Sequence, residues 1–188
     1  MKRSDFLFCA GIELSRFKLL RQRGQLPFVV NGESVEHRGG NYTLAQAFQM
    51  RLMLDLLGGE GDEAATIAGL SPSYAVTVVS EAVRLFPRHP LNQIEPFDWY
   101  LGVAVFEKPY PNAVTARFSE PFGFELAHLS TWLQDRCKPD NRGVATTVVR
   151  LFMVNVTRAA IFVEDRAIER GLPHQVVFAD QSQTGVKT

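Results

Sequence analysis

The first quarter of the chain alternates short apolar stripes with glycines and charged positions. The pattern is clearest over residues 11–27, where Leu14, Phe17 and Leu20 recur at three-residue steps along one side of a helix. Ser15, Arg16, Lys18, Gln22 and Arg23 point elsewhere, and three of these five side chains are cationic. Gly24 stands where a helix C-terminal glycine belongs, just before a proline. The sequence therefore predicts a helix with one buried face and one cationic face.

Two further helices and a hairpin surround this segment. Residues 4–10 predict a short helix with Ser4 as its N-cap, and Gly11 makes the turn into the cationic helix. Residues 44–57 repeat an apolar side chain every fourth position and predict a long core helix. An Asn-Gly pair inside residues 28–43 predicts a β-hairpin. Two short helices joined at a glycine, the second one cationic, are typical of a helix-turn-helix.

The remainder of the chain mixes both kinds of element and predicts an α+β fold. The run 146–156 fits either a strand or a helix, and its β-branched residues favour the strand. A proline-rich stretch, residues 87–96, marks the expected domain boundary. We expect helices over 62–68, 71–86, 124–135 and 158–170, the last capped by Thr157, and strands over 99–106, 113–118, 146–156 and 175–178.

The N-terminal third resembles the mercury-resistance-regulator (MerR) family of winged-helix transcription factors. Family members place a glycine-valine pair, a leucine-arginine pair and a closing glycine-leucine-leucine-proline turn around the recognition helix, and a glycine-tyrosine-arginine motif after the wing. The matching residues here are Gly11-Ile12, Phe17-Lys18, Gly24-Gln25-Leu26-Pro27 and Gly40-Asn41-Tyr42-Thr43-Leu44. Thr43 replaces the wing arginine, and Leu19-Leu20 replace an aromatic pair of the family.

The resemblance implies a winged helix-turn-helix DNA-binding domain over residues 1–88. The pattern of the second half then predicts a small α+β domain over 89–188 that serves for dimerisation or for ligand or partner binding. The implied function is a sequence-specific regulator of transcription that binds double-stranded DNA as a homodimer. The alternative is an adaptor that uses the same scaffold to hold RNA polymerase or another protein.

Candidate DNA contacts follow from the order of residues along the cationic helix. Ser15 and Arg16 lie at its N-terminal end, where base edges are read, and arginine suits a bidentate contact with guanine. Lys18 stands at the family position that meets the DNA backbone. Weaker phosphate candidates are Arg21, Arg23, Arg38 and Tyr42. The plainer interpretation is a solvated charged face, which most charged helix faces are. An adaptor would expose apolar groups there, and Leu19 is the residue that points to this alternative.

Charge supports a local rather than a global attraction to nucleic acid. The 188 residues have a formal net charge of zero, yet the first 51 contain eight lysines and arginines against four carboxylates. Two distant cysteines, the lack of a signal-peptide pattern and the lack of a bilayer-length apolar run predict a cytoplasmic protein without a membrane partner.

Motifs of catalysis and metal binding are missing from the sequence. The four histidines, His37, His89, His128 and His174, have no metal-ligand spacing with cysteine or carboxylate residues. There is no nucleophile-elbow, P-loop or C-x-x-C motif. We therefore expect no enzyme activity, no cofactor and no metal.

Overall fold

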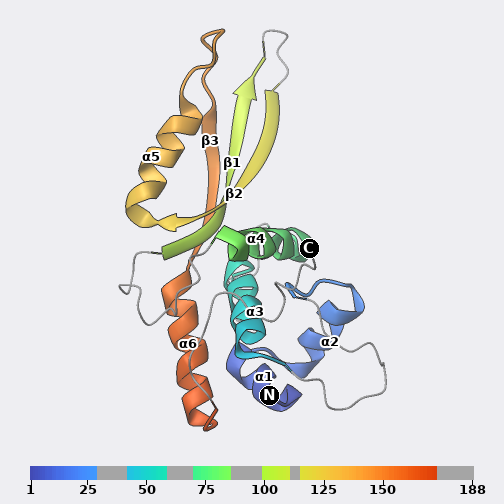
Figure 1. Ribbon diagram of the computed structural model, residues 1–188. Coiled ribbons are helices and arrows are strands. Elements are labelled where there is room, and N and C mark those ends of the chain that lie inside the picture. Colours follow the sequence, from blue (N-terminus) through green and yellow to red (C-terminus); the bar gives the residue numbers. More distant parts are fainter. Residues whose placement is uncertain (29–41, 59–69, 86–98, 111–114, 173–188) are drawn as a thin grey trace, which may run out of the picture.

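The computed structural model describes residues 1–28, 42–58, 70–85, 99–110 and 115–172 (Figure 1). Over these ranges the protein is a mixed α+β structure with six helices and one three-stranded antiparallel sheet, which confirms the predicted class. The elements in chain order are α1 (Arg3–Ala10), α2 (Leu14–Gln22), α3 (Leu44–Leu56), α4 (Pro72–Leu85), β1 (Trp99–Pro109), β2 (Thr115–Glu125), α5 (Leu126–Cys137), β3 (Thr147–Asn155) and α6 (Val156–Glu169).

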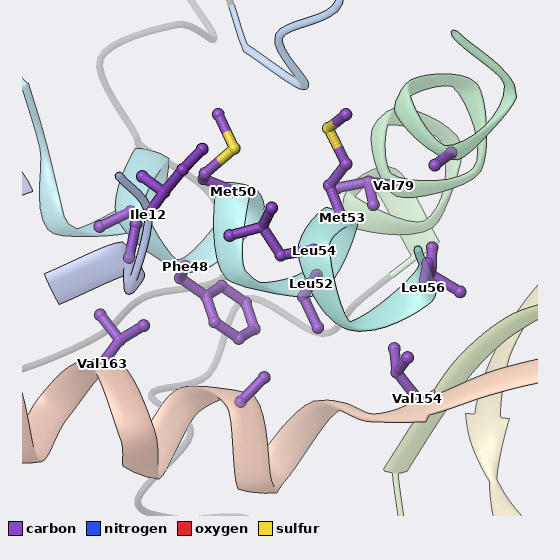
Figure 2. Packing of buried hydrophobic residues seen from close by; sticks show 14 of the residues in the cluster. Ile12, Phe48, Met50, Leu52, Met53, Leu54, Leu56, Val79, Val154 and Val163 are labelled. Atoms are coloured by element: carbon purple, nitrogen blue, oxygen red, sulfur yellow. The ribbon is translucent and has the colours of Figure 1, made fainter. Parts of the chain in front are cut away.

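Helix α3 is the centre of the core, as its composition predicts. Its apolar residues point to all sides, so the helix must be surrounded rather than lie on a surface. Figure 2 shows Phe48 directed toward α6, and Met53 beside Val79 of α4. Helix α1 packs on it as well. A capping box at Thr43, whose hydroxyl accepts the Gln46 N–H while the Gln46 side chain accepts the Thr43 N–H, fixes where α3 begins.

The sheet has the order β2-β1-β3 and a different helix on each face. Alternation along β1 directs Leu101 and Val103 to the face that meets α4, and the hydroxyls of Tyr74 on α4 and Ser119 on β2 hydrogen bond there. On the other face, the Trp132 ring of α5 lies 5.9 Å from the Phe106 ring. The central part of β1, from Leu101 to Phe106, is therefore covered on both faces.

Helix α6 joins the sheet to the N-terminal helices. It follows β3 directly and packs against both α1 and α3 (Figure 1). The buried cluster accordingly contains Val156 and Val163 of α6 together with Phe6 and Phe48. The proposed division at residues 88 and 89 stays a prediction, and the cluster draws side chains from both sides of it.

Several predicted boundaries are corrected. Helix α1 begins at Arg3 with Lys2 as its N-cap, so Ser4 is already helical. Helix α6 is capped by Asn155, whose Oδ1 accepts the Arg158 N–H, and not by Thr157. Strand β2 continues to Glu125 through a proline and a glycine that favour loop structure in a sequence. It can do so because β2 is an edge strand, where a missing N–H is tolerated.

Four predicted features lie outside the described residues. These are most of the hairpin at 28–43, the helix at 62–68, the boundary at 87–96 and the strand at 175–178. The helices predicted over 44–57 and 71–86 and the strand predicted over 146–156 are confirmed with small shifts of their ends. Among the helices that the structure describes, none has the length and apolar content needed to cross a membrane.

Candidate nucleic-acid interface

Two glycine turns fix the direction of α2. Gly11 has φ +66°, and beside it the Ile12 N–H donates to the Leu7 carbonyl at 3.0 Å, closing the end of α1. Gly24 has φ +65°, and the following Gln25 N–H donates to the Leu20 carbonyl at 2.8 Å. Both are Schellman-type ends, for which glycine is preferred because side chains clash in the left-handed conformation. The predicted roles of both glycines are confirmed.

The inner face of α2 is held by an aromatic cluster. The Phe17 ring lies 5.4 Å from that of Phe6 on α1, and Phe6 stacks on Tyr42 with centroids 4.5 Å apart. Leu20 is buried beside them. Leu14, which the periodicity assigned to the same apolar face, is 40% exposed, and this assignment was wrong. Leu14 begins the helix and lies to the side of the stripe that Phe17 and Leu20 define.

The outer face of α2 is polar and cationic. Ser15, Lys18 and Gln22 are exposed and follow one another at the three- and four-residue steps that align side chains on a helix. Arg21 and Arg23 are exposed at its C-terminal end. Within the described part of the chain, no ion pair engages Lys18, Arg21 or Arg23. The charges of these three residues therefore lie on the exposed face of α2.

The remaining predicted contacts differ in accessibility. Ser15 is exposed, and its hydroxyl donates to Glu13 Oε2 at 3.3 Å. Arg16 is half-buried at the flank of the helix, nearer to the core than Ser15 is. Tyr42 is only 3% exposed and lies within the aromatic cluster, so its place favours a core role over a phosphate contact. Arg38 lies outside the described residues.

Sequence reasoning placed Gln22 on the polar side of α2 but did not include it among the candidate DNA contacts. Gln22 lies four residues after Lys18 and seven after Ser15, on the same exposed face. Gln25, just past the helix, donates through Nε2 to Ser73 Oγ on α4 at 2.9 Å. This hydrogen bond ties the C-terminal end of α2 to the helical core and helps to orient it.

The described residues contain no cluster of three or more histidine, cysteine or carboxylate side chains suited to bind a metal ion. Burial raises the pKa of the Cys9 thiol, with a smaller contribution from Asp5, so this cysteine stays protonated and unreactive. The chemistry that this face supports is the binding of anions through side-chain cations.

Comparison of the chain with models of known protein families finds no match, and neither does comparison with curated proteins. The assignment of function therefore depends on the geometry of α2 and its surroundings.

Proposed function

We propose that this protein is a sequence-specific DNA-binding regulator of transcription that inserts α2 into the major groove. The observation that carries the proposal is the cationic outer face of α2, which has no ion pairs to described residues, on a helix held by two glycine turns and an aromatic cluster. A helix whose partners fix its direction can present the same side chains to each base pair. The resemblance of residues 11–27 to MerR-family proteins supports the same function.

Roles along α2 follow from the docking geometry of recognition helices. Ser15 and Arg16, in the first turn, read base edges, and Gln22 adds an amide that suits adenine. Lys18, Arg21 and Arg23 contact phosphates and supply sequence-independent affinity. Half-burial of Arg16 limits its side chain to fewer conformers, which favours a directional contact with guanine.

The test is fluorescence anisotropy with fragments of the source genome across a salt series. Lys18→Ala should weaken binding to all sequences and reduce the slope of log affinity against log salt by about 1. Arg16→Ala should instead reduce the preference for the cognate fragment, at a cost of about 1–3 kcal/mol. Arg142→Ala, which removes an exposed arginine from the loop between α5 and β3, is the matched control. Equal binding by all four proteins would contradict the proposal.

Dimerisation through β3 completes the proposed function. Leu151 and Met153 point to the α5 face of the sheet and are 38% and 40% exposed, on a strand at the sheet edge. Antiparallel pairing of two copies about Phe152 would set Leu151 opposite Met153 of the second copy and join two sheets into one. Pairing about Arg150 would instead oppose two like charges. A twofold dimer presents two α2 helices to two DNA half-sites.

Light scattering after size-exclusion chromatography tests the dimer. The chain has a mass of 21.0 kDa, and we expect twice that mass in solution. Leu151→Lys should yield the single-chain mass, because it places a desolvated charge in the interface. Leu126→Lys changes a similarly exposed leucine on α5 and should leave the dimer intact. A wild-type protein that elutes as a monomer at all concentrations would exclude this part of the proposal.

A second candidate function, the protein-interaction adaptor, is favoured by one observation. Leu14 and Leu19 are 40% and 44% exposed on α2, and exposed leucines on a helix suit a protein groove better than DNA. The double variant Leu14→Ser, Leu19→Ser separates the two functions. A DNA-binding regulator should keep its affinity for the cognate fragment, whereas an adaptor should lose its binding to purified RNA polymerase.

A further inference from the structure

We propose that the cavity between α3 and α6 is a binding site for a small organic carboxylate with an apolar body. The cavity has a volume of about 480 Å³ and lies where β3 passes into α6. Its walls are Arg51 and Asp55 of α3, and Val154, Asn155, Arg158, Ala159 and Phe162 from the end of β3 and the first half of α6. This volume falls in the range of cavities that hold small molecules.

Some polar side chains of the cavity already have partners within the protein, and others do not. Arg51 forms an ion pair with Asp55 one helical turn away, and its guanidinium lies 4.3 Å from the centre of the Phe162 ring. Arg158 is exposed at the mouth, and the described residues offer its side chain no ion-pair partner. The Asn155 side chain is occupied in capping α6. Arg158 is therefore the group that can close on an anion.

Charge and shape together select the class of ligand. Two arginines and one aspartate give the lining one excess positive charge, which matches a monoanion. A dianionic phosphate would meet the carboxylate of Asp55 at close range. Val154, Ala159 and Phe162 supply an apolar wall for the body of the ligand. A planar carboxylate also suits the guanidinium fork of Arg158 in a bidentate contact.

The cavity adjoins the turn that directs α2. A Cβ at Gly11 would lie 2.9 Å from Cζ of Phe162 and 3.1 Å from Nη1 of Arg51, so two cavity residues rest against this turn. A ligand that shifts Arg51 or Phe162 would act on the Gly11 turn that precedes α2. This coupling, unlike the binding itself, rests on the proposed function: occupancy of the cavity should change the affinity for DNA.

The binding test uses the purified full chain and three probes of equal size: benzoate, benzamide and benzylamine. Amide chemical shifts of ¹⁵N-labelled protein are followed during each titration. Benzoate should perturb residues 154–162 and bind about tenfold more tightly than the neutral or cationic probe. Arg158→Ala should abolish that difference while keeping the fold, because the Arg158 side chain is exposed and the backbone N–H of residue 158 still donates to the capping Asn155 Oδ1. Arg142→Ala is again the control, with benzoate binding unchanged.

The outcomes are decisive in both directions. Any one of three results would overturn the site. The first is the absence of chemical-shift changes at residues 154–162 with benzoate up to about 20 mM. The others are equal affinity for benzoate and benzamide, and unchanged benzoate affinity in Arg158→Ala. Asp55→Asn provides a second readout, since removal of the negative charge should tighten benzoate binding. Benzoate is then added to the anisotropy assay with DNA. A protein that binds benzoate at this cavity but no DNA would keep the site and refute the proposed function.

Discussion

The helical and sheet parts of the molecule bury their apolar side chains to very different degrees. In α3, Phe48, Met50 and Leu52 are fully buried, because α1, α4 and α6 surround the helix. In β3, Leu151 and Met153 remain about two-fifths exposed at the sheet edge. Helix α3 is apolar on all sides and has packing partners on all sides, whereas β3 pairs with another strand along only one of its edges. The helical part therefore covers its apolar side chains within one chain, and the sheet edge at β3 does not.

The same comparison shows that the two parts expose different kinds of surface. At α2 the helical part exposes cations, which the proposed function assigns to the phosphates of DNA. At β3 the sheet exposes a strand edge and the apolar side chains of Leu151 and Met153, where the proposed dimer would form. Helix α6 contacts the sheet as well as α1 and α3. A structural change at either surface can therefore reach the other through continuous side-chain packing.

The largest expected effect is at the centre of the helical part. Phe48→Ala should lower the free energy of unfolding by about 3–5 kcal/mol, since a fully buried ring is replaced by a cavity between α3 and α6. Met153→Ala in the sheet should cost less than about 1 kcal/mol in the monomer, because that side chain is already 40% exposed. Urea denaturation followed by circular dichroism measures both.

Repeating both measurements at several protein concentrations tests whether β3 forms a dimer interface. If β3 is the dimer interface, the cost of Met153→Ala should rise with protein concentration, while that of Phe48→Ala should not. Equal costs for the two variants at low concentration would show that the sheet edge is as well packed as the helical core. The contrast between the two parts would then be wrong.

Local signals in the sequence were enough to predict most elements but not how they pack. Gly11 and Gly24 revealed the ends of α1 and α2 because a left-handed cap is a local requirement. Periodicity placed Leu14 on the wrong face, because three-residue steps drift around a helix of about 3.6 residues per turn and carry Leu14 away from Leu20. The return of α6 onto α1 links residues more than 140 positions apart, and no local pattern encodes such a contact.

The candidate site was predicted only in part, for a related reason. The cationic face of α2 follows from helical spacing alone, and Lys18, Arg21 and Arg23 are exposed as expected. Tyr42 was predicted from its place in a family motif, but burial against Phe6 depends on tertiary structure that the motif does not specify. The cavity at Arg51 and Arg158 joins two helices distant in sequence, so only the folded chain reveals it.

A smaller effect is expected at the start of α3, where the helical part depends on one cap. Thr43→Ala removes the hydroxyl that accepts the Gln46 N–H and should cost about 1 kcal/mol. Thr43→Ser keeps the acceptor and should cost much less. Thermal unfolding by calorimetry measures the difference between the two variants. If Thr43→Ala and Thr43→Ser are equally stable, the core around α3, and not its cap, determines where the helix begins.

The smallest effect is expected in the sheet part, where a polar clamp takes the place of a core. Lys108 Nζ on β1 lies 2.8 Å from Asp140 Oδ2, and the backbone N–H groups of Arg142 and Val144 donate to Oδ1. The side-chain hydrogen bond from Lys108, followed by those from Val144 and Arg142, lowers the pKa of Asp140 from 3.8 to about 2.

Because the folded protein holds the charged form of Asp140 more strongly than the unfolded chain does, the clamp stabilises the fold above pH 3.8. This contribution is lost as the pH falls toward 2. Asp140→Asn should therefore be slightly less stable than the wild type at pH 7, and most of this difference should be gone near pH 2, in urea midpoints measured at both values. The carboxyl is solvent-accessible, so added salt should shrink the difference at pH 7. A gap that persists unchanged at pH 2 would mean that the amide disturbs the loop by its shape, and that the charge of Asp140 contributes nothing to the sheet.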